Sequence, residues 1–214
     1  KEKEGLPRHF NAVDWFDSYT LYGLRGNQFT IWDPDKGTVE LLLQEAWEIL
    51  LSPDRARLAY TNKRGLNIFD LKTLKSKPAV ENSGKLSVSQ AAPVCWSPDS
   101  DKLLYAIEHE WYSDFYILDI ATGKSSPYTF NNVDNFLSKP AAWLKNGNIL
   151  FLVSSARSRD GDRAYMSAGY RSDLMEGSPE GNFRAITRME DYSYISLAGL
   201  TGDEREALVL IREK

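Results

Sequence analysis

Few side chains in this sequence have the types and spacing that catalysis needs. The chain has two histidines, His9 and His109, and one cysteine, Cys95. A serine hydrolase places its nucleophile in a strained turn close to a histidine, and the sequence has no Gly-x-Ser-x-Gly segment to form that turn. Neither histidine belongs to a pair with metal-ligand spacing. The sequence therefore predicts no catalytic residue and no metal site.

Cys95 lies in the apolar segment Ala91–Trp96. A lone cysteine cannot form an internal disulfide, and apolar surroundings favour a buried structural thiol over a reactive nucleophile. The sequence also has no glycine-rich phosphate-binding motif and no Cys-x-x-Cys pair. We therefore expect the domain to use no cofactor.

Two segments, Glu108–Tyr112 and Ser154–Gly169, carry more aromatic and arginine residues than a hairpin connection requires. Tryptophan, tyrosine and arginine are the residue types that most often dominate the binding energy of protein interfaces. The alternative is that the aromatic residues are the extended ends of strands that pack on a neighbouring blade and that the arginines are solvated surface charges. The predicted binding residues, for a protein or peptide ligand, are His109, Trp111, Tyr112, Arg157 and Arg159.

The triplet Asp160-Gly161-Asp162 offers two carboxylates of the kind that bind calcium. The further oxygen ligands of a calcium-binding loop are missing around it. The triplet therefore predicts a tight turn.

The elements that position these segments follow from an internal repeat. The triplet Ser-Pro-Asp begins at Ser52 and again at Ser97, 45 residues later, and each copy is followed by two short apolar segments. The matching segments are Leu58–Tyr60 with Leu103–Tyr105 and Leu66–Asp70 with Phe115–Asp119. Because proline presets φ and aspartate can bond the local backbone, the triplets predict turns and not binding sites.

Weaker copies of the repeat flank these two. Trp143 follows Trp96 by 47 residues, and Asn146-Gly147-Asn148 takes the place of the Ser-Pro-Asp turn. Each copy has four short segments rich in β-branched and aromatic residues, bounded by Gly, Pro, Asn and Asp, which is typical of hairpin-linked strands. The predicted units are residues 10–43, 46–80, 92–130, 140–188 and 194–214, with residues 1–9 as a linker or processed N-terminus.

Four strands in each period of about 40 to 47 residues are typical of β-propeller blades. We predict an all-β chain that folds as a β-propeller of four-stranded antiparallel blades. The count is four full blades and part of a fifth, as in a fragment of a propeller with six or more blades. A β-sandwich is the alternative, but it does not predict the same turn at the same place in every unit.

The repeat also resembles a known family. Trp96-Ser97-Pro98-Asp99, followed by Lys102–Tyr105 and Tyr116–Asp119, resembles the WD40-like repeat of the TolB type. The segment from Ser172 to Thr187 is similar to the second half of such a repeat. This resemblance covers about residues 10 to 212 and implies the propeller fold. It implies no catalytic residue, because the matching residues are structural in that family.

The composition favours a folded domain without a nucleic-acid partner. Of the 214 residues, 42% are hydrophobic and 26% are charged, enough for one sizeable domain or two small ones. The 30 acidic and 26 basic residues are scattered, with a net charge of -4 and no basic stripe that would follow phosphates. No apolar run approaches the roughly 18 to 20 residues that cross a bilayer, so we expect no transmembrane segment.

Two function classes remain for such a chain. We expect a non-enzymatic propeller that binds a protein or peptide through its loop face, located outside the cytoplasm of a bacterium as a periplasmic protein or an anchored lipoprotein, as the TolB-type resemblance implies. The alternative is a non-catalytic accessory propeller of a prolyl-oligopeptidase-like peptidase or another hydrolase. An incomplete last blade would also leave an open edge for self-association.

Overall fold

The repeats form antiparallel sheets in which neighbouring strands are consecutive in the chain. The computed structural model describes residues 10–82, 90–108, 113–129, 135–155, 171–187, 192–201 and 207–213. Over these residues every regular element is a β-strand. The described part of the chain therefore contains no helix with the length and apolarity to cross a membrane.

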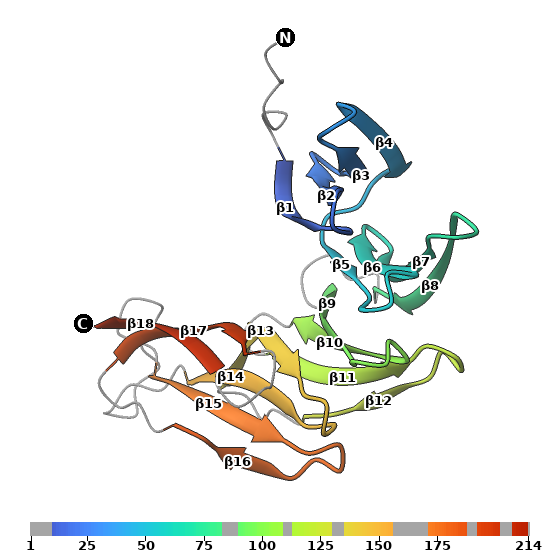
Figure 1. Ribbon diagram of the computed structural model, residues 1–214. Helices are drawn as coiled ribbons and strands as arrows, with labels where there is room; N and C mark the ends of the chain where they lie inside the picture. Colours follow the sequence, from blue (N-terminus) through green and yellow to red (C-terminus); the bar gives the residue numbers. More distant parts are fainter. Residues whose placement is uncertain are drawn as a thin grey trace. The chain divides into compact units, whose positions relative to one another are not determined.

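Two sheets of four strands come from the first 82 residues (Figure 1). We call them blade one and blade two. Their strands are β1 (Phe10–Trp15), β2 (Leu21–Arg25), β3 (Gln28–Asp33) and β4 (Thr38–Leu43) in blade one, and β5 (Ile49–Leu51), β6 (Arg57–Asn62), β7 (Gly65–Asp70) and β8 (Lys75–Glu81) in blade two. The strand order is sequential in both, so each blade is a meander of hairpins.

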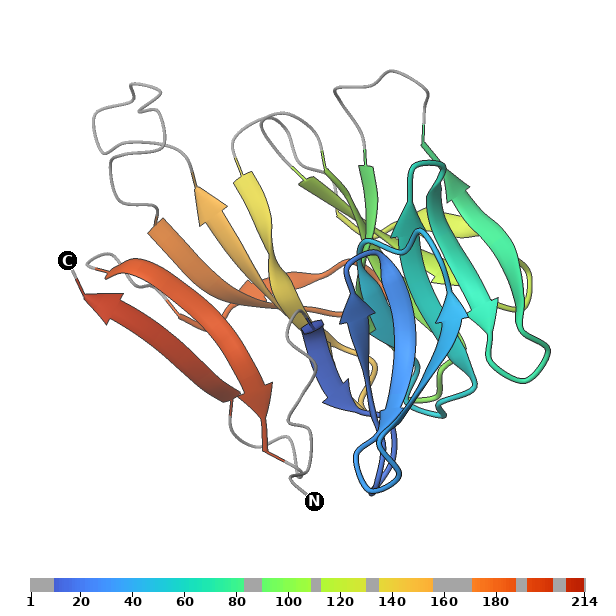
Figure 2. The same cartoon turned by 90° about the horizontal axis from the view of Figure 1, so that it is seen from above.

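Blade three, blade four and a two-stranded sheet follow. Blade three contains β9 (Gln90–Trp96), β10 (Lys102–Glu108), β11 (Ser113–Asp119) and β12 (Ser125–Pro127); blade four contains β13 (Asn135–Trp143), β14 (Ile149–Ser155), β15 (Arg171–Gly177) and β16 (Phe183–Ala185); the last sheet pairs β17 (Tyr192–Leu200) with β18 (Ala207–Glu213). The strand order is again sequential in each sheet, and Figure 2 shows the same strands from above, coloured along the sequence.

The chain divides into two compact units, Lys1–Asn82 and Ser83–Lys214, and each has a core of its own. In unit one, alternate residues of β2 and β3 point to one face of blade one, as the two-residue period of a strand requires. This face carries Tyr22, Leu24 and Phe29, which belong to one cluster with Leu58 and Phe69 of blade two. Phe29, Leu58 and Phe69 are at most 2% exposed.

The core of unit two lies between blades three and four. Leu104 and Phe115 come from blade three and Ile149 and Phe151 from blade four, all at most 2% exposed. The rings of Phe115 and Phe151 meet edge to face, with centroids 5.7 Å apart. Cys95 packs against this core, and burial raises the pKa of its thiol to about 12. The environment is therefore that of a structural thiol, in agreement with the sequence prediction.

The Ser-Pro-Asp triplets form the turn between the first two strands of blades two and three. The Ser52 hydroxyl donates to Asp54 Oδ1 (2.5 Å) and accepts from the backbone N–H of Arg57 (3.0 Å). The Ser97 hydroxyl donates to Asp99 Oδ1 (2.5 Å) and accepts from the N–H of Lys102 (2.9 Å). The predicted structural role of the triplets is confirmed, because their side chains are engaged in holding the turn.

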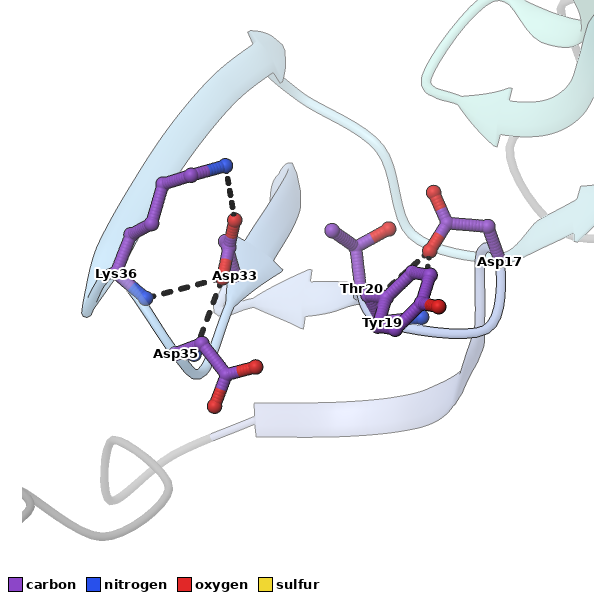
Figure 3. A network of polar contacts seen from close by, with 6 residues as sticks. All are labelled: Asp17, Tyr19, Thr20, Asp33, Asp35 and Lys36. Carbon is purple, nitrogen blue, oxygen red and sulfur yellow. Dashed lines mark hydrogen bonds and ion pairs between the residues drawn. The ribbon is translucent and has the colours of Figure 1, made fainter.

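A second repeated device closes the hairpin between the third and fourth strands. Asp33 ends β3, and its carboxylate accepts from the backbone N–H groups of Asp35 and Lys36 and from the Lys36 ammonium (Figure 3). Asp70 and Asp119 make the same kind of turn in blades two and three. These turns lie at the same end of each blade as the Ser-Pro-Asp turns, because successive strands of a meander reverse direction.

Candidate functional site

The binding residues predicted from the sequence fall on segments that the structure does not describe. They are His109, Trp111, Tyr112, Arg157 and Arg159, and the Asp160-Gly161-Asp162 triplet lies outside the described residues too. Their role in binding stays a prediction.

Within the described residues, unit two has a groove of about 700 Å³ between blades three and four. It lies at the end where the first and last turns of each blade emerge, since both kinds of turn line it. The lining residues from blade three are Ser97, Pro98, Asp99, Lys102, Ile117, Asp119, Thr122, Lys124, Ser125 and Ser126, and those from blade four are Trp143, Leu144, Lys145, Gly147 and Pro179.

Strand register places two lysines on either side of an aspartate at the mouth of this groove. Lys102 of β10 pairs with Asp119 of β11, and the backbone N–H of Asp119 donates to the carbonyl of Lys124, the residue immediately before β12 (2.9 Å). Paired residues of antiparallel strands point to the same face of a sheet. The side chains of Lys102, Asp119 and Lys124 therefore form a row, which we call the lysine row.

The floor of the groove is apolar and continuous with the core. Ile117 lies two residues before Asp119 on the same face of β11, and it packs with Trp143 of blade four against the core of unit two. The indole Nε1–H of Trp143 donates to the carbonyl of Gly147 (3.1 Å), which ties the ring to the turn beside it. The groove thus offers an apolar floor beneath a charged and hydroxyl-bearing mouth.

A buried carboxylate supports the blade four wall. Glu176 is 8% exposed, accepts from the side-chain amide of Asn148 (2.6 Å) and forms an ion pair with Arg184. The hydrogen bond from Asn148 and the charge of Arg184 lower the pKa of Glu176. Asn148 follows Gly147, so this cluster anchors the turn that lines the groove.

The two carboxylates at the mouth are already engaged by their own turns. Asp119 Oδ1 accepts from the N–H (2.8 Å) and the hydroxyl (2.7 Å) of Thr122, and Asp99 Oδ1 accepts from Ser97. These hydrogen bonds lower the pKa of both aspartates, and Lys102 contributes to both shifts. Both carboxylates therefore remain charged and held in place at neutral pH.

The two lysines of the row differ from these carboxylates in how their charged groups are engaged. Lys102 and Lys124 have exposed side chains, and within the described residues neither forms an ion pair. An ammonium group of this kind can donate to an incoming ligand without first breaking a salt bridge. The lysine row is therefore the part of the groove that is best suited to bind a ligand.

The lysine row has a counterpart in one other blade. Blade two has Arg57, Asp70 and Lys75 in the same register. At the position of Lys124, blade one has Thr38, which pairs with Asp33, and blade four has Asn182. A cationic side chain at this position thus occurs in the two blades that carry Ser-Pro-Asp turns.

Sequence reasoning missed Lys102, Lys124 and Trp143 as ligand-binding candidates. The two lysines are separated in sequence by more than twenty residues, and each by itself is an ordinary surface charge. Their alignment depends on the register that the Asp119 turn sets. Counting outward from that aspartate along the repeat would have found the row.

The lining of the groove also limits which chemical groups it contains. Its lining residues, all described, include neither histidine nor cysteine. Over the described residues, no group of three or more His, Cys, Asp or Glu side chains is arranged to hold a metal ion. What the site supplies is ammonium and hydroxyl donors over an apolar floor.

No protein-family model matches the sequence, and no curated protein is significantly similar to it. The fold, in contrast, is similar to several solved structures. TolB from Acinetobacter baumannii has a TM-score of 0.61 and 18% identity, over 87% of this chain and 43% of that chain.

Two enzymes show the same degree of similarity. The acylaminoacyl peptidase of Pyrococcus horikoshii has a TM-score of 0.64 at 18% identity, over 96% of this chain and 36% of the peptidase. An oligogalacturonate lyase in complex with manganese has a TM-score of 0.65 at 14% identity, over 91% of this chain and 56% of the lyase.

The chain thus spans between about a third and somewhat more than half of the length of these three proteins. At such low identity the similarity establishes the fold alone. Together with the four antiparallel four-stranded sheets, it identifies this chain as an all-β protein with the β-propeller fold of TolB-like proteins.

Proposed function

We propose that this chain is a non-enzymatic binding domain that holds an extended protein segment in the groove between blades three and four. The groove itself carries the proposal, because it combines the lysine row with the apolar floor of Ile117 and Trp143. Binding sites of this kind use apolar contact for affinity and a few placed polar groups for orientation. An extended segment suits a groove that is open to solvent along its mouth.

The comparisons support a binding or accessory role without choosing between them. TolB and an acylaminoacyl peptidase are both similar in fold to this chain. The second candidate function is therefore an accessory propeller of a hydrolase, in which the groove would hold substrate segments outside the catalytic part. The TolB likeness further supports an extracytoplasmic location in a bacterium.

The loop residues predicted from the sequence make a second proposed contact surface. His109, Trp111 and Tyr112 follow the end of β10, and Arg157 and Arg159 follow the end of β14. β10 and β14 run away from the groove-lining turns, so the last residues of these strands lie at the opposite end of blades three and four. A partner that contacts both ends of a blade would need to wrap around it, so we assign the two surfaces to separate contacts.

The groove is tested by filling it. Ser126 is exposed on β12 and lines the groove, so Ser126→Trp should occupy the space without disturbing the core. Peptides would be selected from a random 12-residue display library against the parent protein, and their affinities measured for the parent and the variant by fluorescence polarisation. We expect selected peptides to lose at least about tenfold in affinity for Ser126→Trp.

The matched control is Thr38→Trp, an exposed position on the outer strand of blade one. It adds the same ring in unit one and should leave the affinities unchanged. If no selected peptide distinguishes Ser126→Trp from Thr38→Trp, the groove is not a peptide site and the proposed function is wrong.

A further inference from the structure

We infer that the groove of unit two selects acidic segments, in particular those with carboxylate side chains at alternate positions. This inference rests on the proposed function and names the chemistry of its ligand. The inference follows from a contrast between the charged groups at the mouth of the groove. Some are hydrogen-bonded within their own turns, and others can still bind a ligand.

The charged groups that line the groove are Asp99, Asp119, Lys102, Lys124 and Lys145. The two aspartates each accept at least two hydrogen bonds from their own turns. The ammonium groups of Lys102 and Lys124 form no ion pair within the described part of the chain, so they can bind a ligand. An anionic group can accept hydrogen bonds from both ammonium groups, whereas each aspartate has its Oδ1 held by its own turn.

The spacing of the lysine row fits an extended peptide. Lys102 is on β10 and Lys124 immediately precedes β12, on the two sides of β11, so their backbones are about 10 Å apart, two strand spacings of about 4.8 Å. Side chains at alternate positions of an extended peptide are about 7 Å apart on one side. The two lysine side chains are long and exposed, so their ammonium groups can come closer together than their backbones are. They can therefore contact two carboxylates of the peptide at once.

A hydroxyl group reinforces the preference for carboxylates. Ser126 pairs with Ile117 and is exposed on the groove face of β12, where its hydroxyl can donate to a carboxylate oxygen. The chain as a whole has a net charge of -4, which would by itself repel acidic segments. The groove, in contrast, presents groups that attract carboxylates. Binding must therefore be local to the lysine row and should weaken with salt.

The test uses three fluorescein-labelled hexapeptides with blocked ends: alternating Glu-Ser, alternating Gln-Ser and alternating Lys-Ser. We expect the full chain to bind the Glu-Ser peptide at least about tenfold more tightly than the other two at low salt. The double variant Lys102→Gln/Lys124→Gln should lose at least about tenfold in affinity for it, because both charge-assisted hydrogen bonds are removed. Circular dichroism and thermal unfolding would check that the variant is folded.

The control variant is Lys63→Gln/Lys77→Gln, which removes the same charge from two exposed lysines of unit one. It should change the affinity less than about twofold. Equal losses in both double variants, or equal binding of the Glu-Ser and Gln-Ser peptides, would overturn the inference. Displacement of the peptide by inorganic phosphate at equal concentration would also overturn it, since the site would then be one for small anions.

The two proposals can fail separately. If library peptides depend on the groove but are not acidic and bind the lysine variant as well as the parent, the acidic preference is wrong and the groove function stands. If no peptide depends on the groove, both are wrong.

Discussion

Tyr128 brings a hydroxyl into the core of unit two without a hydrogen-bond partner among the described residues. Its ring packs edge to face on Phe151 and Phe183, with centroids 6.3 Å and 5.5 Å away. The side chain is 5% exposed, and burial raises the pKa of Tyr128. The ring is thus well placed, whereas its hydroxyl has been taken from water without a replacement partner.

We predict that Tyr128→Phe raises the free energy of unfolding by about 1 kcal/mol, because it removes the desolvation cost of an unpaired hydroxyl and keeps the ring contacts. Urea denaturation followed by tryptophan fluorescence measures this. A destabilised variant would show that the hydroxyl has a partner that stabilises the fold.

Gly177 provides the matched test of the same packing. A Cβ at Gly177 would meet the Tyr128 hydroxyl and the ring of Phe183 at less than contact distance. Gly177→Ala should therefore destabilise the protein by about 1 to 3 kcal/mol, as overpacked core positions do. The cost should shrink in Gly177→Ala/Tyr128→Phe, and equal costs in the two backgrounds would contradict this packing.

At the scale of the element, the turn between the third and fourth strands of blade two contains a strained residue. Leu74 has a φ of 56°, where blades one and three have Gly37 (66°) and Gly123 (69°) at the same position. The left-handed region costs a residue with a side chain more than it costs glycine. Leu74 is also 56% exposed, so its side chain contributes little to the core.

We predict that Leu74→Gly stabilises the protein by about 0.5 to 1 kcal/mol, since the relief of backbone strain exceeds the added chain entropy. Differential scanning calorimetry would show a higher melting temperature. The reverse change, Gly123→Leu in blade three, serves as the control and should lower it.

The aspartates of these turns also predict how stability depends on pH. Hydrogen bonds to their carboxylates lower the pKa of Asp33, Asp70 and Asp119 below the ordinary value of 3.8. A lowered pKa in the folded state means that each contribution is complete above pH 3.8. It is lost as the pH falls through 3.8 toward the folded-state pKa.

We therefore expect the melting temperature to be nearly constant from pH 7 to pH 5 and to fall below pH 4. The variant Asp70→Asn/Asp119→Asn should start lower at pH 7 and lose less on acidification, because two of the titrating groups are gone. The measurement is thermal unfolding by circular dichroism at each pH. A parallel decline of parent and variant would place the acid sensitivity in other groups.

At the scale of the whole molecule, the two cores belong to different units. One cluster is made of residues from blades one and two and the other of residues from blades three and four. Phe69 and Phe115 are the matched probes, at 2% and 0% exposure in the respective cores. Repeat proteins of this kind derive their stability mainly from contacts between neighbouring repeats.

We predict that Phe69→Ala and Phe115→Ala each cost about 3 to 5 kcal/mol in the core that holds them. Hydrogen exchange followed by mass spectrometry should show faster exchange in β2, β3, β6 and β7 for the first variant and in β10, β11, β14 and β15 for the second. Equal acceleration in all eight strands with either variant would mean that the cores unfold as one.

The residues of the turns show which structural features can be predicted from local sequence. Ser52, Ser97 and the aspartates Asp70 and Asp119 specify their turns through contacts within a few residues, so the turns, the strands between them and the four-stranded blades could be predicted. The period of the repeat then predicted the propeller fold, which the sheets and the comparisons confirm.

The groove was decided by tertiary structure alone. Lys102 and Lys124 align with Asp119 because three strands pair in one register, and Trp143 reaches them because blade four packs on blade three. Hydrophobic periodicity determines which face of a strand is buried, but it does not determine which turns of neighbouring blades meet. That depends on the packing of two whole sheets, whose energy is spread over many apolar contacts and leaves no motif in the sequence.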